Sequence, residues 1–233
     1  MNHYFTTLRF PPRSAKGRCA VAAAIAALSI ATTAPAQFFA GAGATYSETT
    51  FRPEYDFAYD RPNSSYENVA YGTELDLAGG YRIPVGPHAS LGLAGSLGAG
   101  EARWSKRSET SGYHLDYRLP ARAFLSLQPA WHPSPRLRVF GELGAGTGYV
   151  ELVKEADSDA TSRYDESRWL AGGRFGGGVA YAFADGWEIA AWYLRTAYES
   201  FRYDSHLADG SVWERIRDKP YANAFTVGLT RVW

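Results

Sequence analysis

Apolar residues alternate with polar or small residues through most of the chain between positions 37 and 233, and no long stretch shows a helical period. Alternate side chains of an extended strand point to opposite faces, so this pattern predicts β-strands. The clearest stretch runs from Leu115 to Trp131, where odd positions are mostly apolar and even positions include Arg118 and Arg122. We therefore expect one face of this strand to be apolar over its whole length and the other to carry charge.

Seven further segments alternate in the same way, which gives eight predicted strands. These segments start near Phe38, Tyr71, Leu91, Leu137, Trp169, Trp187 and Phe225. Short turns rich in Pro, Gly and Asp follow the second, fourth and sixth strands. Longer polar stretches join the other strands, at roughly 51–67, 105–113, 154–167 and 204–219. The sequence thus predicts an all-β fold: an eight-stranded antiparallel up-and-down transmembrane β-barrel with short periplasmic turns and long extracellular loops.

A soluble barrel would alternate too, with its apolar face inside, so other features must decide between lipid and water. The less apolar face is rich in Gly, Ala and Ser, which suits the narrow interior of an eight-stranded cylinder. After residue 36 the lysines are Lys106, Lys154 and Lys219, all in the predicted loops. Aromatic residues gather toward strand ends, as interfacial girdles require; they include Tyr46, Trp104, Tyr117, Trp131, Trp169, Tyr181, Phe183, Trp187, Tyr198 and Trp233. These features favour lipid outside the barrel.

The first 36 residues have the composition of a secretory signal. A basic stretch from Arg9 to Arg18 precedes twelve mostly apolar residues, and Ala34-Pro35-Ala36 follows with small residues where a signal peptidase needs them. We expect residues 1–36 to be a signal peptide cut after Ala36, leaving a barrel of residues 37–233 exported to a bacterial outer membrane. An apolar run this short is well below the length of a spanning helix.

Charge and cysteine content exclude several functions. The full chain has 24 Lys and Arg against 24 Asp and Glu, and removing the four cations of the signal leaves 20 against 24. The remaining chain is acidic, so we expect no nucleic-acid partner. The only cysteine, Cys19, lies within the predicted signal. A disulfide, a zinc–thiolate cluster or a catalytic thiol is therefore excluded after residue 36.

The last segment carries a resemblance to a known family. It ends on an aromatic residue preceded by apolar residues at alternate positions (Phe225, Val227, Leu229 and Trp233). This resembles the C-terminal strand that the outer-membrane assembly machinery recognises. The chain as a whole resembles the small eight-stranded outer-membrane barrels typified by the outer membrane protein A membrane domain and the Ail/Lom and opacity-type proteins. Trp233 replaces the usual Phe, and Arg231 stands where an apolar residue is expected; its side chain could reach the headgroups.

A set of charged residues falls on the predicted inward face, and we name it the lumen charge network. Its members are Glu74, Asp76, Arg82, Arg118, Arg122, Arg138, Glu142, Arg174 and Glu188. Ionised groups in so narrow an interior must pair or stay hydrated, because an unpaired buried charge is costly. One hypothesis is a structural salt-bridge core that fills the cylinder. The other, which the resemblance suggests, is a switchable charge gate that passes small ions.

Histidines offer the remaining chemistry. His88-Ala-Ser90 and His132-Pro-Ser134 resemble the His-x-Ser pair of lipid A deacylases, but both fall in short turns, away from the outer leaflet. His114 and His206 would lie at the outer rim, where omptin-type proteases keep catalytic groups. Loop histidines are usually solvated, and no cluster shows metal-ligand spacing. We expect a non-enzymatic protein without a catalytic, cofactor or metal site.

The predicted function is an envelope structural or surface-interaction role of the adhesin type. Long loops rich in Tyr, Arg and acidic residues suit an extracellular ligand. Basic rim residues could clamp lipopolysaccharide phosphates; they are Arg103, Lys106, Arg107, Arg168, Arg202 and Arg215. The expected partners are outer-membrane lipids, lipopolysaccharide, the assembly machinery and an extracellular ligand. The alternatives are a narrow ion-conducting channel and, less favoured, a lipid A- or peptide-cleaving enzyme.

Overall fold

The computed structural model describes residues 36–57, 64–65, 67–108, 113–156, 164–206 and 210–233. The predicted signal peptide falls almost wholly outside this part of the chain, so its cleavage stays a prediction. Every regular element in the described residues is a strand, and none of these residues forms a helix long and apolar enough to cross a membrane.

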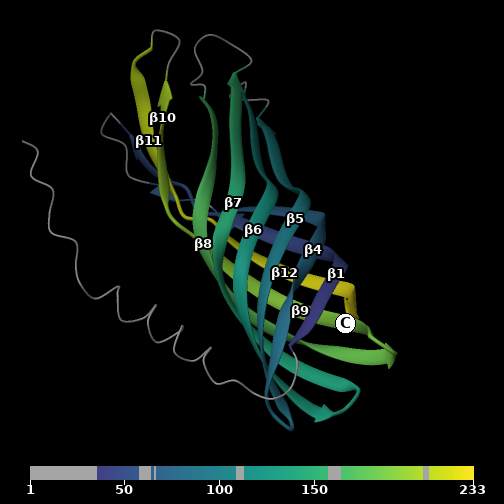
Figure 1. The fold of residues 1–233 in the computed structure, drawn as a ribbon. Helices are drawn as coiled ribbons and strands as arrows, with labels where there is room; N and C mark the ends of the chain where they lie inside the picture. The colour runs from purple at the N-terminus through teal and green to yellow at the C-terminus, as the bar shows by residue number, and fades with distance from the viewer. Residues whose placement is uncertain (1–35, 58–63, 66, 109–112, 157–163, 207–209) are drawn as a thin grey trace, which may run out of the picture. The chain divides into compact units, whose positions relative to one another are not determined.

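Eight strands close into a barrel in which every neighbouring pair is antiparallel (Figure 1). In ring order they are β1 (Gln37–Phe51), β4 (Asn68–Gly86), β5 (Ala89–Ser108), β6 (Tyr113–Ser134), β7 (Leu137–Ala156), β8 (Tyr164–Ala184), β9 (Trp187–Tyr198) and β12 (Tyr221–Val232). The ring is sealed where β1 pairs with β12, from Phe39 opposite Val232 to Thr50 opposite Tyr221. The predicted eight-stranded antiparallel barrel is confirmed.

The side chains of the barrel wall sort as the alternation predicts. On β6, Leu125 points outward and is 69% exposed, whereas its neighbour Ser126 points inward and is 2% exposed. Large apolar side chains on the other strands are exposed in the same way, for example Leu75, Leu97, Leu143, Phe175, Ile189 and Val227. A continuous apolar outer wall of this kind is stable only against acyl chains. The inside of the barrel is left to small and charged side chains.

One stretch of β6 departs from the prediction. The pairing of β6 with β7 shifts between Arg118 and Ala121, so the alternation changes phase at Pro120. Proline lacks a backbone N–H, and strand prolines accordingly occur at bulges. On the N-terminal side of Pro120, toward the long-loop end, the predicted faces are exchanged. Tyr117 and Leu119 point inward there and are 0% and 1% exposed. The expectation of a single apolar outer face from Leu115 to Trp131 is therefore wrong for the residues that precede Pro120, from Leu115 to Leu119.

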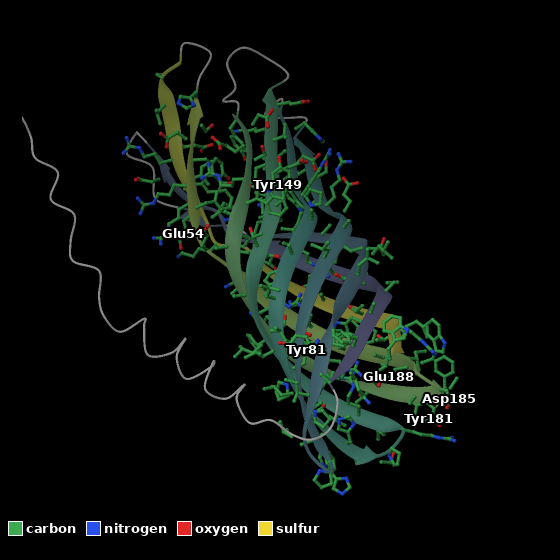
Figure 2. All side chains as sticks on the ribbon, viewed as in Figure 1. Glu54, Tyr81, Tyr149, Tyr181, Asp185 and Glu188 are labelled. Atoms are coloured by element: carbon green, nitrogen blue, oxygen red, sulfur yellow. The ribbon has the colours of Figure 1, made fainter. Side chains whose placement is uncertain are left out.

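Strands β5 to β8 are 20, 22, 20 and 21 residues long. A membrane-spanning strand needs only about 9–11 residues, so roughly half of each lies beyond the hydrocarbon. At the short-turn end the outward positions are apolar, whereas at the other end they are polar residues such as Glu101, Arg103 and Glu151. In Figure 2, Tyr149 and Glu54 lie toward the long-loop end, and Tyr81 and Glu188 toward the short-turn end. The extracellular halves of β5–β8 thus project from the membrane.

A second sheet forms where long polar loops were predicted. It contains β2 (Glu54–Phe57), β3 (Ser64–Ser65), β10 (Phe201–His206) and β11 (Val212–Asp218), in the order β10-β11-β2-β3. The predicted loops 51–67 and 204–219 are therefore partly strand. The predicted loops 105–113 and 154–167 are also largely strand, except for the residues outside the described chain.

The second sheet and the projecting halves of β5–β8 share an apolar interior, which we call the outer core. Its buried members include Phe51, Leu115, Tyr117, Leu119, Val150, Leu152, Tyr164, Leu170, Phe201, Tyr203 and Ile216. Tyr117 is central: its ring centroid lies 4.9 Å from that of Phe51 and 5.6 Å from that of Trp104. Burial of large aromatic side chains supplies most of the stability of such a core. The strands therefore continue outside the membrane as a packed structure.

The aromatic girdles agree with the prediction at seven of ten positions. Exposed outward rings are Tyr46, Trp131, Trp169, Tyr181, Phe183, Trp187 and Trp233. Three assignments are wrong. Tyr117 and Tyr198 are buried, and Trp104 packs against the outer core. These rings sit near the ends of alternating segments, but the strands continue beyond the lipid, so an aromatic near that end can face inward.

Candidate functional site

The lumen charge network is arranged in groups along the barrel interior. Nearest the outer core, the Arg122 guanidinium lies 3.0 Å from the Glu74 carboxylate and 2.7 Å from that of Asp76. The Thr45 hydroxyl donates to Asp76 and lies 2.7 Å from the Thr226 hydroxyl. One arginine thus meets two carboxylates here, so this group has a formal charge of −1.

A second group pairs one arginine with one acid. The Arg174 guanidinium lies 2.5 Å from the Glu142 carboxylate and also donates to the Ser126 hydroxyl at 2.8 and 3.1 Å. The Gln128 amide donates to Glu142 at 3.0 Å. The guanidinium stacks on the Phe124 ring, 4.6 Å from its centroid. Each ion is thus fixed by polar and aromatic neighbours.

The third group lies toward the short-turn end and has two arginines for one acid. Arg82 and Arg138 contact opposite oxygens of the Glu188 carboxylate, at 2.9 and 3.0 Å. Each guanidinium stacks on a phenylalanine, Arg82 on Phe39 at 4.6 Å and Arg138 on Phe140 at 4.5 Å. The group has a formal charge of +1. The formal charges in the lumen therefore sum to zero, with the excess negative charge nearest the outer core and the excess positive charge toward the short-turn end.

Arg118 is the exception among the predicted network residues. Because of the register shift at Pro120 it points outward, with its side chain 36% exposed. Its guanidinium lies 2.6 Å from Asp116, which also binds Arg103 at 2.8 Å. Burial alone would raise the pKa of Asp116, but hydrogen bonds from Arg118 and Arg103 hold this pKa below its usual range. Arg118 thus belongs to a surface cluster on the projecting part of β6.

Sequence reasoning missed the lumen partners that carry no charge. Thr45, Ser126 and Gln128 follow the inward alternation of their strands, so position alone could have identified them. It also missed the role of Asp116, because its place on the outer face depends on the register shift. No signal in the sequence beyond Pro120 marks that shift.

The lumen has a small cavity in its lower half and packed side chains above it. A cavity of about 50 Å³, room for a few waters, lies between the Arg82/Arg138 group and the Arg174/Glu142 group. Toward the outside, the Tyr198 ring fills the interior beside Gly148 and Gly172, where a Cβ atom would come within 2.7 and 2.8 Å of the ring. The outer core lies beyond it. The interior is thus wettable in its lower half and packed with apolar side chains above.

The predicted assembly residues lie on the outer wall. Phe225, Val227, Leu229 and Trp233 are 51%, 44%, 44% and 64% exposed. The Arg231 guanidinium donates to the Asp185 carbonyl and stacks over Trp187, with a centroid distance of 5.4 Å. Its charge is thus held at the periplasmic rim. Recognition of this strand by the assembly machinery stays a prediction.

The histidines fall at both ends of the barrel. At the periplasmic end the two His-x-Ser pairs cross, so that Ser90 Oγ lies 2.9 Å from His132 Nε2. At the outer end the His114 ring lies 3.4 Å from the Ser105 hydroxyl, in an exposed contact. His206 is exposed near the end of β10. Among the described residues, no group of three or more His, Cys, Asp and Glu side chains could hold a metal ion.

Asp218 is a buried acid at the junction of β11 and the barrel. It is 0% exposed, and one of its oxygens accepts a hydrogen bond from the Arg52 backbone N–H at 2.9 Å. The other oxygen has no hydrogen-bond partner among the described residues. Burial raises the pKa of Asp218 to about 7, although hydrogen bonds from the Arg52 and Lys219 backbone oppose the shift. This carboxyl therefore titrates near neutral pH.

Comparison with solved structures shows the same fold in distant proteins. The chain matches the outer membrane protein OprG of Pseudomonas aeruginosa with a TM-score of 0.51 at 11% identity, covering 84% of this chain and 95% of that one. A major outer membrane protein of Thermus thermophilus gives 0.51 at 12%, covering 86% and 100%. The outer membrane protease OmpT of Escherichia coli gives 0.51 at 10%, covering 85% and 96%. At such identities the likeness shows the fold alone.

Comparison with curated protein sequences finds no match. Comparison with family models matches residues 19–231 to the outer membrane protein beta-barrel domain. The match includes all eight strands of the closed barrel, apart from the last residue of β12. The chain therefore belongs to the outer membrane protein β-barrel family and is a protein of the bacterial outer membrane.

Proposed function

We propose that this protein acts at the cell surface as a non-enzymatic outer-membrane protein with a structural or ligand-binding role. The observation that carries the proposal is the outer core, which orders the extracellular segments instead of leaving them as solvated loops. Ordered strands present fixed side chains, so a partner can bind them without the entropy cost of ordering a loop. A barrel that served only as a membrane anchor would not need this structure.

The outer face of the second sheet is the proposed binding surface. Arg202 of β10 lies directly opposite Arg217 of β11, and Arg215 lies opposite both Asp204 and Asp56. These side chains point away from the outer core, whose inward positions are held by Tyr203 and Ile216. Exposed arginines beside acids favour a partner with mixed charge, and like charges placed opposite each other are relieved by a bound anion.

Lipopolysaccharide is the proposed membrane partner. Arg103 and Arg118 lie on the outer wall beyond the apolar band, with side chains 44% and 36% exposed, and we infer that the phosphates of the outer leaflet lie beside them. They share Asp116, and their second carboxylate, Glu101, is more distant, 3.6 Å from Arg118 and 3.9 Å from Arg103. A lipid phosphate would replace Glu101 as the second partner of the two guanidinium groups. Bidentate contacts from arginine to phosphate are strong.

The non-enzymatic assignment rests on the histidine surroundings. At the outer rim, where a lipid or peptide substrate would lie, the described contact of His114 is a long hydrogen bond to Ser105. A general base needs a short contact and a third group that orients it. The channel alternative needs a path through the outer core, which is packed around Tyr117.

A surface-display experiment tests the proposal. The protein would be expressed in a Gram-negative host of low adherence, and retention of cells on epithelial monolayers and on immobilised lipopolysaccharide would be measured. We expect retention above that of the empty host, and its loss when Arg202, Arg215 and Arg217 are replaced by Glu. Arg136→Glu, in the exposed periplasmic turn after β6, is the control. Retention no higher than that of the empty host on both surfaces would contradict the proposal.

Conductance measurements separate the channel alternative. In planar bilayers we expect the wild-type protein to show no steady current, because the outer core closes the lumen. Glu142→Ala frees Arg174 but leaves that core intact, so it should not create a current either. A steady wild-type current that changes in Glu142→Ala would favour the ion channel instead.

A further inference from the structure

The periplasmic mouth of the barrel has a hollow that the surface role does not use. Its volume is about 380 Å³, and the side chains that reach it with polar groups are those of Gln37, Arg82, His88, Ser90, His132 and Ser134. Four prolines at the ends of β4 and β6 and in the turns that follow them, together with Gly86 and Ala89, form the rest of its wall. The hollow lies at the periplasmic ends of four neighbouring strands, β1, β4, β5 and β6.

The lining of this hollow is rich in hydrogen-bond donors. None of the described residues that line it is an Asp or a Glu. The Gln37 amide, the two hydroxyls, the Arg82 guanidinium and the imidazoles can all donate. A cation would find few strong ligands here, since arginine repels it and no carboxylate lines the wall. An anion would find donors on several sides.

The charge at the base of the hollow also favours an anion. Arg82 is buried, with its side chain 6% exposed, and shares its acid Glu188 with Arg138. The Nε atoms of Arg82 and Arg138 have no hydrogen-bond partner among the described residues. Arg82 shares one carboxylate with a second arginine and has an N–H donor without a partner, so an oxyanion that binds there gains a charge-assisted hydrogen bond.

The two His-x-Ser pairs of the sequence meet at this position. Ser90 Oγ and His132 Nε2 are 2.9 Å apart, and the His132 backbone N–H donates to the His88 carbonyl at 2.8 Å. These contacts hold the turns after β4 and β6 against each other. The hydroxyl and the imidazole are thus fixed at the wall of the hollow, opposite the open mouth.

We propose that the periplasmic mouth is a binding site for a small soluble oxyanion, a phosphate, sulfate or carboxylate group, held by Arg82, Ser90 and His132. Lipid headgroups carry the same chemistry but lie outside the barrel wall, whereas these side chains face inward. The ligand therefore comes from the periplasm. A carboxylate or phosphate that is part of a larger periplasmic molecule would fit because the hollow is open on one side.

Calorimetric titration with sodium sulfate tests the site. Sulfate keeps its charge over the range in which histidine titrates, so only the protein changes with pH. The full-length protein, extracted in a non-ionic detergent at low ionic strength, should bind one sulfate saturably. Arg82→Gln should weaken binding by about tenfold, because the charged donor is lost. This variant leaves Arg138 and Glu188 as a matched pair, and heat-modifiable gel migration confirms that it has folded.

Arg136→Gln is the matched control, since Arg136 lies in the same turn as Ser134 but does not line the hollow. It should bind sulfate as the wild type does. His132→Gln should remove the increase in affinity that the wild type shows at lower pH; Arg82, Arg138, Glu188 and His88 are the charged and titratable groups that face this histidine. Equal loss in Arg136→Gln and Arg82→Gln, or binding that does not saturate, would overturn the proposal.

Reconstitution separates the two sources of anion. In vesicles of phosphatidylethanolamine, with or without phosphatidylglycerol, sulfate should bind with the same affinity. Loss of sulfate binding only in vesicles that contain phosphatidylglycerol would show that a lipid headgroup occupies the site, and this would overturn the assignment to a soluble ligand.

Discussion

Arg122 and Glu74 form an ion pair inside the barrel in which both side chains are almost fully buried, 4% and 2% exposed. Arg122 also pairs with Asp76, so its removal leaves two carboxylates without a cation. We expect Arg122→Met to lower the free energy of unfolding by about 3–5 kcal/mol, as for other buried pairs that lose one partner. Urea unfolding in detergent micelles, followed by tryptophan fluorescence, measures the change.

A triple variant provides the control for this prediction. In Arg122→Met with Glu74→Gln and Asp76→Asn, no ion is left unpaired, so most of the lost stability should return. Arg52→Ala breaks an exposed pair with Glu67 and should leave the urea midpoint unchanged. A triple variant as unstable as Arg122→Met would show that shape and not charge governs this part of the lumen.

The Tyr198 ring depends on two glycines of the facing strands. A Cβ atom at Gly148 would lie 2.7 Å from the ring, too close for any real contact. We expect Gly148→Ala to displace Tyr198 and to destabilise the barrel by about 1–3 kcal/mol, the usual cost of overpacking. Gly173→Ala is the control. Gly173 is exposed on the lipid-facing side of β8, and the nearest described atom to a Cβ there is the Gly144 carbonyl oxygen, 4.0 Å away. Equal unfolding midpoints for the two variants would contradict this account.

Alternation was sufficient to predict the barrel itself. Leu125 and Ser126 face opposite sides as predicted. Alternating positions allow only two assignments, with the odd residues either outside or inside, and the small residues fit the narrow interior. The same reasoning placed Glu74, Glu142 and Arg174 in the lumen. This reasoning could not predict which acid contacts which arginine, since these contacts depend on the stagger between neighbouring strands. No local sequence pattern determines that stagger.

The extracellular region could not be predicted from pattern in the same way. Pro120 allows a register shift but does not require one, so Arg118 was assigned to the wrong face. Strands β10 and β11 carry charged residues at alternate positions, Arg202 and Asp204 in one and Arg215 and Arg217 in the other, which also fits a polar loop. Their strand structure comes from the burial of Tyr203 and Ile216 against residues distant in sequence. Long-range packing of this kind has no local signal.

Cysteine labelling tests the register shift directly. The only native cysteine lies in the predicted signal peptide, so single cysteines can be introduced without a background from the barrel. On intact cells, an impermeant maleimide should label Arg118→Cys and not Leu119→Cys, since the side chain at 118 is 36% exposed beyond the apolar band and residue 119 is 1% exposed. A lipid-soluble maleimide should label Leu125→Cys and not Ser126→Cys. Labelling at 119 instead of 118 would mean that the alternation runs through Pro120 unbroken.

Asp218 should make the extracellular structure sensitive to pH. Its pKa in the folded protein is about 7, raised from the ordinary value of 3.8. Between these values the unfolded chain is ionised while the folded chain still binds a proton. The contribution of Asp218 to the free energy of unfolding is therefore largest at or below about pH 4, falls as the pH rises toward 7, and levels off above that value. The loss is on the order of a few kcal/mol, since each unit of pKa shift corresponds to about 1.4 kcal/mol.

Asp218→Asn removes this titration but keeps an oxygen that can accept the Arg52 N–H. The variant should be more stable than the wild type near pH 8 and equal to it near pH 4. Near-ultraviolet circular dichroism reports on the buried rings of Tyr117, Tyr164 and Tyr203, so urea midpoints at the two pH values can be compared. Asp56→Asn, at an exposed position on β2, should leave the pH dependence of the wild type in place. If Asp218→Asn retained the full dependence on pH, another group would have to bind the proton, because the variant has no ionisable side chain at position 218.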